Sequence, residues 1–280
     1  MFDVFRICFC NIKKWTINPR VYLIPIILLI FTHLALSPVA FFSRTVDIAV
    51  SPWSLPFIMA DSYLVFLFFS ALIILFCDAP FISQEHTFML IRAGKTKFFI
   101  SQVLYIFIAG ALFVFVLFGM SFIVLNNISF TNQWGKIWGT LAQTNAAAQF
   151  RIPLIIYHKI IIDYKPIEAT LLCALLTWLV SVFLGLLMCL LNSIMNRFIG
   201  TVCAAALVLL QWGASFFFGR NSLYFSPVSW TNLNTIDKAG LTGYPSIAYV
   251  VTFLCVAIAV LSFLIVFVNR KQEIKIYAQI

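Results

Sequence analysis

Long hydrophobic runs separated by short polar stretches dominate the pattern along this chain. A membrane-crossing helix needs about 20 apolar residues, because the hydrocarbon core is about 30 Å thick and each helical residue adds about 1.5 Å. The runs are apolar at odd and even positions alike, as in LLCALLTWLVSVFLGLLMCLL at 171–191, which excludes the alternating strands of a barrel. The pattern predicts an all-α polytopic membrane protein. Six transmembrane helices are expected, near residues 21–43, 57–77, 98–125, 169–191, 198–219 and 247–269.

The first 20 residues, MFDVFRICFCNIKKWTINPR, have a different pattern from the spans. Phe2, Phe5 and Phe9 recur at three- and four-residue spacing, and charged residues occupy other faces of a helix. Trp15 is typical of an anchor at headgroup level. Residues 1–20 are therefore predicted to form an interfacial amphipathic helix in contact with membrane lipid, with a frayed tail as the alternative.

Two longer insertions are expected on the side opposite to the chain termini. Residues 126–168 include FRIPLIIYHKIIIDYK at 150–165, which is too polar to span but apolar enough to lie on the membrane or cap a cavity. Residues 220–246 are rich in Ser, Thr, Asn, Pro and Gly and indicate an ordered loop. Neither insertion is long enough for a separate core, so residues 1–280 are expected to form one transmembrane domain.

Composition and charge agree with this class and add an orientation. Hydrophobic residues make up 63% of the chain and charged residues 10%, against about 25% charged in soluble domains. The positive-inside rule places both termini in the cytoplasm of a multi-pass protein of the cell membrane. The net charge of +9 then reflects topology, and no nucleic acid partner is expected. The residues expected on the cytoplasmic side are Arg6, Lys13, Lys14, Arg20, Arg92, Lys95, Lys97, Arg197, Arg270, Lys271 and Lys275.

Ionisable chemistry at membrane depth is sparse. His33 is the one ionisable side chain well inside a predicted span, and a buried neutral histidine is favoured over a proton relay. Paired catalytic carboxylates, a histidine-glutamate metal helix and a Gly-x-Ser-x-Gly motif are missing from the sequence. No catalytic residue and no metal site are therefore predicted. An ion-coupled carrier is disfavoured, although backbone carbonyls bind sodium in some carriers.

The tetrapeptide AGKT at 93–96 echoes the end of a nucleotide-binding loop. That loop requires a glycine five positions before the glycine of the Gly-Lys pair, and Met89 stands there. The motif therefore fails, and no nucleotide or other cofactor is expected to bind this chain directly.

The residues before AGKT carry the start and stop signals of a short helix. Asp78 or Ser83 is a candidate cap at the start, and Gly94 suits the C-terminal end. Phe81 and Phe88 repeat at seven-residue spacing and give the segment one apolar edge. A helix is predicted at 81–93, and an interfacial helix that merely joins two spans is the alternative.

An amphipathic N-terminal helix, six spans and the loop QEHTFMLIRAGKTKFFISQVLYIF before the third span together resemble the permease subunits of ATP-binding-cassette type-2 exporters. In that family this loop forms a coupling helix that docks in a cleft of the ATPase subunit. Members often carry a tight re-entrant hairpin before the last span, and residues 220–246 are more polar than such a hairpin. The ATPase-docking residues implied by the resemblance are Glu85, His86, Phe88, Met89 and Arg92.

The resemblance implies that ATP and Mg bind a separate ABC ATPase subunit, which hydrolyses the nucleotide, so this chain is not itself an enzyme. Six spans are about half of a transport pathway, which implies a dimer with a second copy or a similar permease. Gly200 and Ala204 suit close helix packing in such a dimer, or ordinary packing within the chain.

The many phenylalanines, with Trp178 and Trp212, favour export of an amphipathic or apolar substrate such as a peptide, lipid or drug. The alternative from another class is a non-transporting membrane scaffold or immunity protein. Such a protein would bind its partner through the two outer loops.

Overall fold

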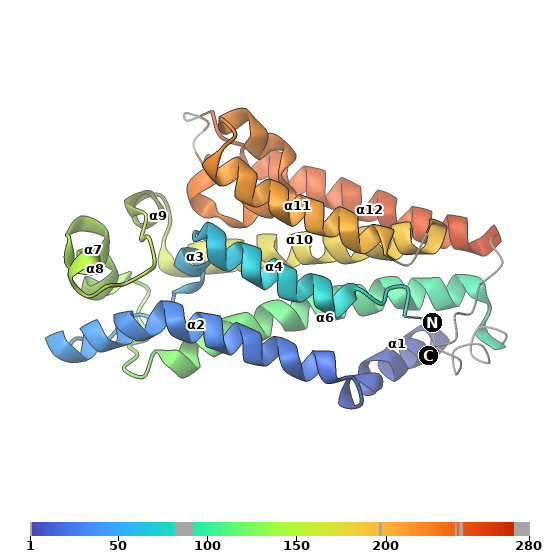
Figure 1. The fold of residues 1–280 in the computed structure, drawn as a ribbon, viewed down its shortest axis with the longest axis horizontal. Coiled ribbons are helices and arrows are strands. Elements are labelled where there is room, and N and C mark those ends of the chain that lie inside the picture. The colour runs from blue at the N-terminus through green and yellow to red at the C-terminus, as the bar shows by residue number, and fades with distance from the viewer. Residues whose placement is uncertain (1, 82–91, 196–197, 239, 241–242, 272–280) are drawn as a thin grey trace.

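The computed structural model describes residues 2–81, 92–195, 198–238, 240 and 243–271. The long helices run side by side along the longest dimension of the molecule (Figure 1). In chain order the elements are α1 (Phe2–Lys13), η1 (Lys14–Thr16), α2 (Pro19–Val46), α3 (Leu55–Ile58), α4 (Ser62–Phe76), α6 (Lys95–Val124), α7 (Gly135–Gln143), α8 (Ala146–Gln149), α9 (His158–Asp163), α10 (Pro166–Ile194), α11 (Ile199–Phe216), η2 (Arg220–Phe225), η3 (Pro227–Thr231), η4 (Leu233–Thr235) and α12 (Ile247–Lys271).

Helix α1 lies at one end of the bundle and α7, α8 and α9 lie at the other, which we name the α1 end and the α7 end (Figure 1). Within the described residues, five helices are long and apolar enough to cross a membrane, namely α2, α6, α10, α11 and α12. The prediction of an all-helical, multi-pass membrane protein is confirmed to this extent.

The second predicted span, 57–77, is not one continuous helix. The chain forms the short α3, turns, and restarts as α4, whose 15 residues extend about 22 Å at about 1.5 Å each. Asp61 causes the restart, because its carboxylate accepts hydrogen bonds from the backbone N–H of Tyr63 at 2.9 Å and of Leu64 at 3.1 Å. Such a cap satisfies two of the N–H groups that a helix start leaves unpaired.

Helix α10 is the most buried of the five long helices and packs against α4, α6, α11 and α12. Gly185 allows close approach to two helices, because a Cβ atom there would lie 2.7 Å from Ile106 of α6 and 3.1 Å from Phe76 of α4. Helix α2 packs outside α10, against α4 and α6. The bundle is therefore organised around α10.

The 126–168 insertion folds against the α7 end of the bundle. Trp138 is fully buried, stacks on Phe57 of α3 at 4.8 Å and donates its indole N–H to the carbonyl of Ser51 at 3.0 Å. Trp134 lies 5.0 Å from the same ring and donates to the carbonyl of Tyr164 at 2.9 Å. The two tryptophans bury large apolar rings with satisfied N–H groups and so attach α7 to α3.

Within the 220–246 segment, residues 220–235 form the short helices η2, η3 and η4, and the centre of this part is buried despite its polarity. Every residue of η3 is buried, and η3 packs against α10, α11 and α12. Its polar groups are paired, for example the hydroxyl groups of Ser226 and Ser229 at 2.7 Å. Asn232 donates to the carbonyl of Ala60, which joins this segment to the turn between α3 and α4. Local hydrogen bonds thus make burial of a polar sequence possible.

Within the region predicted at 1–20 the chain forms α1 and the short η1, and α2 already begins at Pro19. The buried side of α1 consists of Ile7, Cys8 and Asn11, and α1 packs against α6. Phe5 and Phe9, which the pattern assigned to the lipid side, are 58% and 68% exposed. One side of α1 therefore packs against α6, and the exposed phenylalanines lie on another side.

We expect Asp61→Ala to lower the free energy of unfolding by about 1 kcal/mol, because α4 loses its cap. Asp61→Asn is the matched control, since an asparagine oxygen accepts the same two hydrogen bonds. Thermal unfolding in detergent micelles measures both variants. Equal losses in the two variants, or no loss in either, would contradict the capping role.

Candidate functional site

The structure describes the two flanks of the predicted docking segment, which follow α4 and precede α6. Four of the predicted docking residues, Glu85, His86, Phe88 and Met89, lie outside the described residues. Arg92 is described, is helical and has an exposed side chain. Gly94 follows with a φ of 83°, a conformation that favours glycine, and α6 begins directly after it. The contacts that hold these two flanks in place make up the candidate site.

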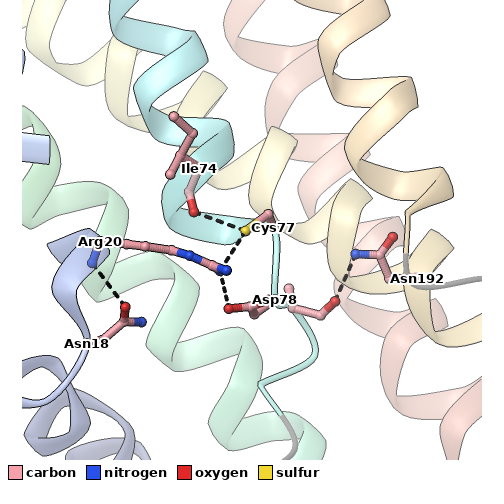
Figure 2. A network of polar contacts seen from close by, with 7 residues as sticks. Asn18, Arg20, Ile74, Cys77, Asp78 and Asn192 are labelled. Carbon is pink, nitrogen blue, oxygen red and sulfur yellow. Dashed lines mark hydrogen bonds and ion pairs between the residues drawn. The ribbon is translucent and has the colours of Figure 1, made fainter. Parts of the chain in front are cut away.

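The first contact joins the start of α2 to the end of α4 (Figure 2). Asn18 caps α2 by accepting a hydrogen bond from the backbone N–H of Arg20 at 3.1 Å. The Arg20 side chain crosses to the other helix, where it forms an ion pair with Asp78 and donates to the Cys77 sulfur at 3.0 Å. The pair is partly exposed, so its contribution to stability is modest and its main effect is to fix position.

The second contact joins the residue after Asp78 to α10 and α11. The side-chain N–H of Asn192, in the last turn of α10, donates to the carbonyl of Ala79 at 2.9 Å (Figure 2). The oxygen of the same side chain accepts from the backbone N–H of Gly200 at 2.8 Å. Asn192 is 8% exposed, so both hydrogen bonds lie in a buried environment where an unpaired partner is costly.

Gly200 and Ala204 pack against other residues of the same chain. A Cβ atom at Gly200 would lie 2.6 Å from the carbonyl oxygen of Met188 and 2.6 Å from the side-chain oxygen of Asn192. Ala204 is fully buried. Of the two alternatives for these small residues, packing within the chain is therefore the one observed, because α11 starts in direct contact with α10.

The third contact joins α12 to α10. Asn269 donates to the hydroxyl of Ser193 at 3.2 Å and to the carbonyl of Ile265 at 2.8 Å. Neighbouring residues in the last turn of α10 thus bind three other parts of the chain. We name this set the polar collar, which comprises Asn18, Arg20, Cys77, Asp78, Ala79, Asn192, Ser193, Gly200 and Asn269.

Two further contacts join the same region to α1 and α6. The indole N–H of Trp15 donates to the hydroxyl of Tyr105 at 2.6 Å, and the ring of Phe81 packs edge-on against Tyr105 at 4.7 Å. Tyr105 therefore contacts the N-terminal region and the residue that directly precedes the predicted docking segment.

An ion pair joins the start of α1 to the start of α6. Lys97 Nζ lies 2.8 Å from a carboxylate oxygen of Asp3. The hydrogen bond from Lys97 holds the pKa of Asp3 below its ordinary value of 3.8. The stabilising ion pair is therefore complete at neutral pH and is lost as pH falls through the lowered pKa of Asp3.

His33 differs from its prediction. The side chain is exposed on α2 and lines a hollow of about 440 Å³ with Leu29, Ile30, Leu34, Ile123, Val124 and Asn126. The buried neutral histidine predicted here is wrong, because this face of α2 borders an open hollow at the end of α6 and does not pack into the core. Within the described ranges, no group of three or more His, Cys, Asp or Glu side chains is arranged to hold a metal ion.

The sequence reasoning missed the collar residues Asn192, Gly200 and Asn269 as an interacting set. Asn192 and Asn269 carry a usable signal, because amides at the ends of apolar helices require hydrogen-bond partners. The identity of those partners depends on the packing of α10 against α11 and α12, which is not local in sequence.

Fold and site together define a class: a helical multi-pass membrane protein in which the helix ends at one side are joined by a polar collar. Comparison with protein-family models, with curated proteins and with solved structures found no match.

We expect Gly200→Ala to destabilise the protein by about 1 to 3 kcal/mol, because the added methyl group collides with backbone of α10. Gly119→Ala is the matched control, since Gly119 lies inside α6 with nothing within 4 Å of its Cβ position, and alanine favours helix there. Thermal unfolding in micelles should separate the two variants. Equal stability of both variants would rule out the close contact at Gly200.

Proposed function

We propose that this chain is the transmembrane permease subunit of an ATP-binding-cassette type-2 exporter. A separate ATPase subunit would bind ATP and Mg and dock on the segment at 81–93. The observation that carries the proposal is the frame around this segment: Asp78 is bound to α2, Ala79 to α10, and Phe81 contacts α6 through Tyr105. A displacement of the segment would therefore be transmitted to several long helices at once.

The proposed mechanism depends on rigid helices that the polar collar connects to the docking segment. ATP binding would bring two ATPase subunits together and move the docking segments with them. Because the collar links Ala79 to α10 and α11, this movement would tilt those helices as units. Opening and closing of a pathway between two permease chains would then alternate access to the two sides of the membrane.

We infer that α4 provides a sixth crossing, and the direction of the chain supports this inference. Helix α2 ends at the α7 end, whereas α6 starts at the α1 end (Figure 1). The chain between them must therefore return along the bundle, and α3 and α4 form that return. With six crossings, α1 and the end of α12 share one side of the membrane. The basic residues of that side sit on short connections, which favours a cytoplasmic location for both termini.

The dimer partner, whether a second copy or a similar permease, needs a surface other than Gly200 and Ala204. Those residues are occupied by packing within the chain. The proposed substrate remains amphipathic or apolar. Trp178 does not add to that argument, because its indole N–H donates to the carbonyl of Phe107 at 3.0 Å and the ring joins α10 to α6. Trp212 packs with Phe216 and Phe217 near the α7 end of α11.

A second candidate function has one observation in its favour. The lobe of α7, α8 and α9 is ordered and exposes large apolar side chains, including Ile155 and Ile162 at 59% and 67%. Such a surface suits the scaffold or immunity protein, which would bind a partner at the α7 end.

The test is copurification from native membranes. The unmodified chain should copurify with a protein that hydrolyses ATP. The double charge reversal Glu85→Lys with Arg92→Glu should reduce the amount of copurified ATPase at least tenfold, because docking contacts become repulsive. The control exchanges the charges of the ion pair Lys238 and Glu168, whose 2.7 Å contact survives exchange. That control should retain the ATPase.

Retention of the ATPase after the reversal at Glu85 and Arg92 would exclude docking at this segment. A chain that never binds an ATPase, and whose function is abolished by deletion of 126–168, would instead establish the scaffold or immunity function.

A further inference from the structure

The described face of α1 that points away from α6 combines two strips of side chains. Phe5 and Phe9 are one helical turn apart and are both more than half exposed. Arg6 and Lys13 are two turns apart and also exposed. At about 100° per residue the basic strip lies directly beside the phenylalanine strip. An apolar strip beside a basic strip is the arrangement of helices that lie in the surface of a charged membrane.

The charges of this face are not cancelled by the acidic residue of the same helix. Asp3 is the acidic side chain of α1, and it is paired with Lys97 of α6. Arg20, at the start of α2, adds a further exposed cation close to the end of α1, although it is shared with Asp78. The exposed face of α1 is therefore complementary to a negatively charged partner.

The packing of α1 on α6 includes buried polar side chains. The side-chain amides of Asn11 in α1 and Gln102 in α6 are buried and have no hydrogen-bond partner among the described residues. Burial of unpaired amides weakens the packing of α1 on α6. A contact on the opposite face of α1 would offset this loss and hold the helix in place.

We propose that α1 is a binding surface for the anionic headgroups of the bilayer leaflet it faces. Phe5 and Phe9 enter the boundary of the hydrocarbon, while Arg6 and Lys13 bind lipid phosphate groups. Trp15 then holds the lipid-bound helix against Tyr105, which also contacts Phe81. Lipid charge thereby stabilises one position of the flank that precedes residues 82–91. This inference stands independently of the transport proposal.

The chain contains two cysteines suited to a direct test. Cys10 lies on α1 and is partly exposed, whereas Cys255 is exposed on α12, about two turns after the start of that helix. A fluorophore is attached to either one in chains whose other cysteines are replaced by alanine. The full-length protein is placed in bilayers of equal parts phosphatidylglycerol and phosphatidylcholine, and one of the two lipids carries brominated acyl chains that quench nearby fluorophores.

At Cys10 we expect brominated phosphatidylglycerol to quench more than brominated phosphatidylcholine. The preference should amount to about fivefold for each basic side chain in contact with the surface. High salt should reduce it, because exposed charges are screened. At Cys255 both lipids should quench equally, since that fluorophore reports the hydrocarbon around α12.

The variant Arg6→Gln with Lys13→Gln should lose the preference at Cys10. Its matched control, Lys136→Gln with Lys165→Gln, removes two exposed charges from the α7 end and should keep it. Unchanged quenching at Cys255 verifies that each variant is folded in the bilayer.

Three results would overturn the proposal. The first is equal quenching of the Cys10 fluorophore by both lipids. The second is a preference that persists in the Arg6 and Lys13 variant. The third is loss of the preference when inorganic phosphate replaces chloride at constant ionic strength, which would mean that α1 binds free phosphate rather than lipid.

Discussion

The packing of α10 against its neighbours is the constraint on which the rest of the structure depends. A buried helix in a bilayer has little hydrophobic advantage over a lipid-exposed one, so close contact and hydrogen bonds must hold it. Gly185 provides the close contact with α4 and α6. Asn192 provides the hydrogen bonds, because its amide joins the carbonyl of Ala79 to the N–H of Gly200.

The two ends of the bundle are held by different physical means. At the α7 end, buried tryptophan rings attach the α7 lobe, and η3 inserts a paired polar segment beside α10. At the α1 end, single side chains join helix ends: Arg20 to Asp78, Asn192 to Ala79, and Asn269 to Ser193. The Arg20–Asp78 pair is partly exposed and contributes little to stability, whereas the side chains of Asn192 and Asn269 are buried and leave a costly unpaired group if their hydrogen bonds break.

Much of the helical architecture was predictable, because the hydrophobic runs are long and the bilayer sets a minimum length for a span. The break before α4 was harder to predict, since Asp61 reads as a polar residue near a span end, and only the cap geometry reveals that a new helix starts there. The burial of η3 was hidden for a related reason: its serine and threonine side chains form local hydrogen bonds that composition does not reveal. His33 was misplaced because periodicity in an all-apolar helix does not distinguish the lipid face from the protein face.

The candidate docking site also has a part that the sequence predicts and a part that it does not. Local signals such as the glycine at 94 predicted the helix at 81–93, and the family resemblance supplied its docking residues. The collar depends on contacts between helices that are distant in sequence, for example the hydrogen bond between Asn192 and Ala79, which are 113 residues apart. The flanks therefore connect the segment to the bundle, and the residues of the segment are proposed to select the ATPase subunit.

The most direct measurement of the central claim is photo-crosslinking in native membranes, with a photoreactive amino acid placed at position 88 of the full chain. The account predicts a crosslink to a protein that contains an ATP-binding-cassette ATPase domain, identified by mass spectrometry, and no such product with the same residue at position 130, in the loop before α7. Crosslinks from position 88 to lipid alone, or to a protein of another class, would contradict it.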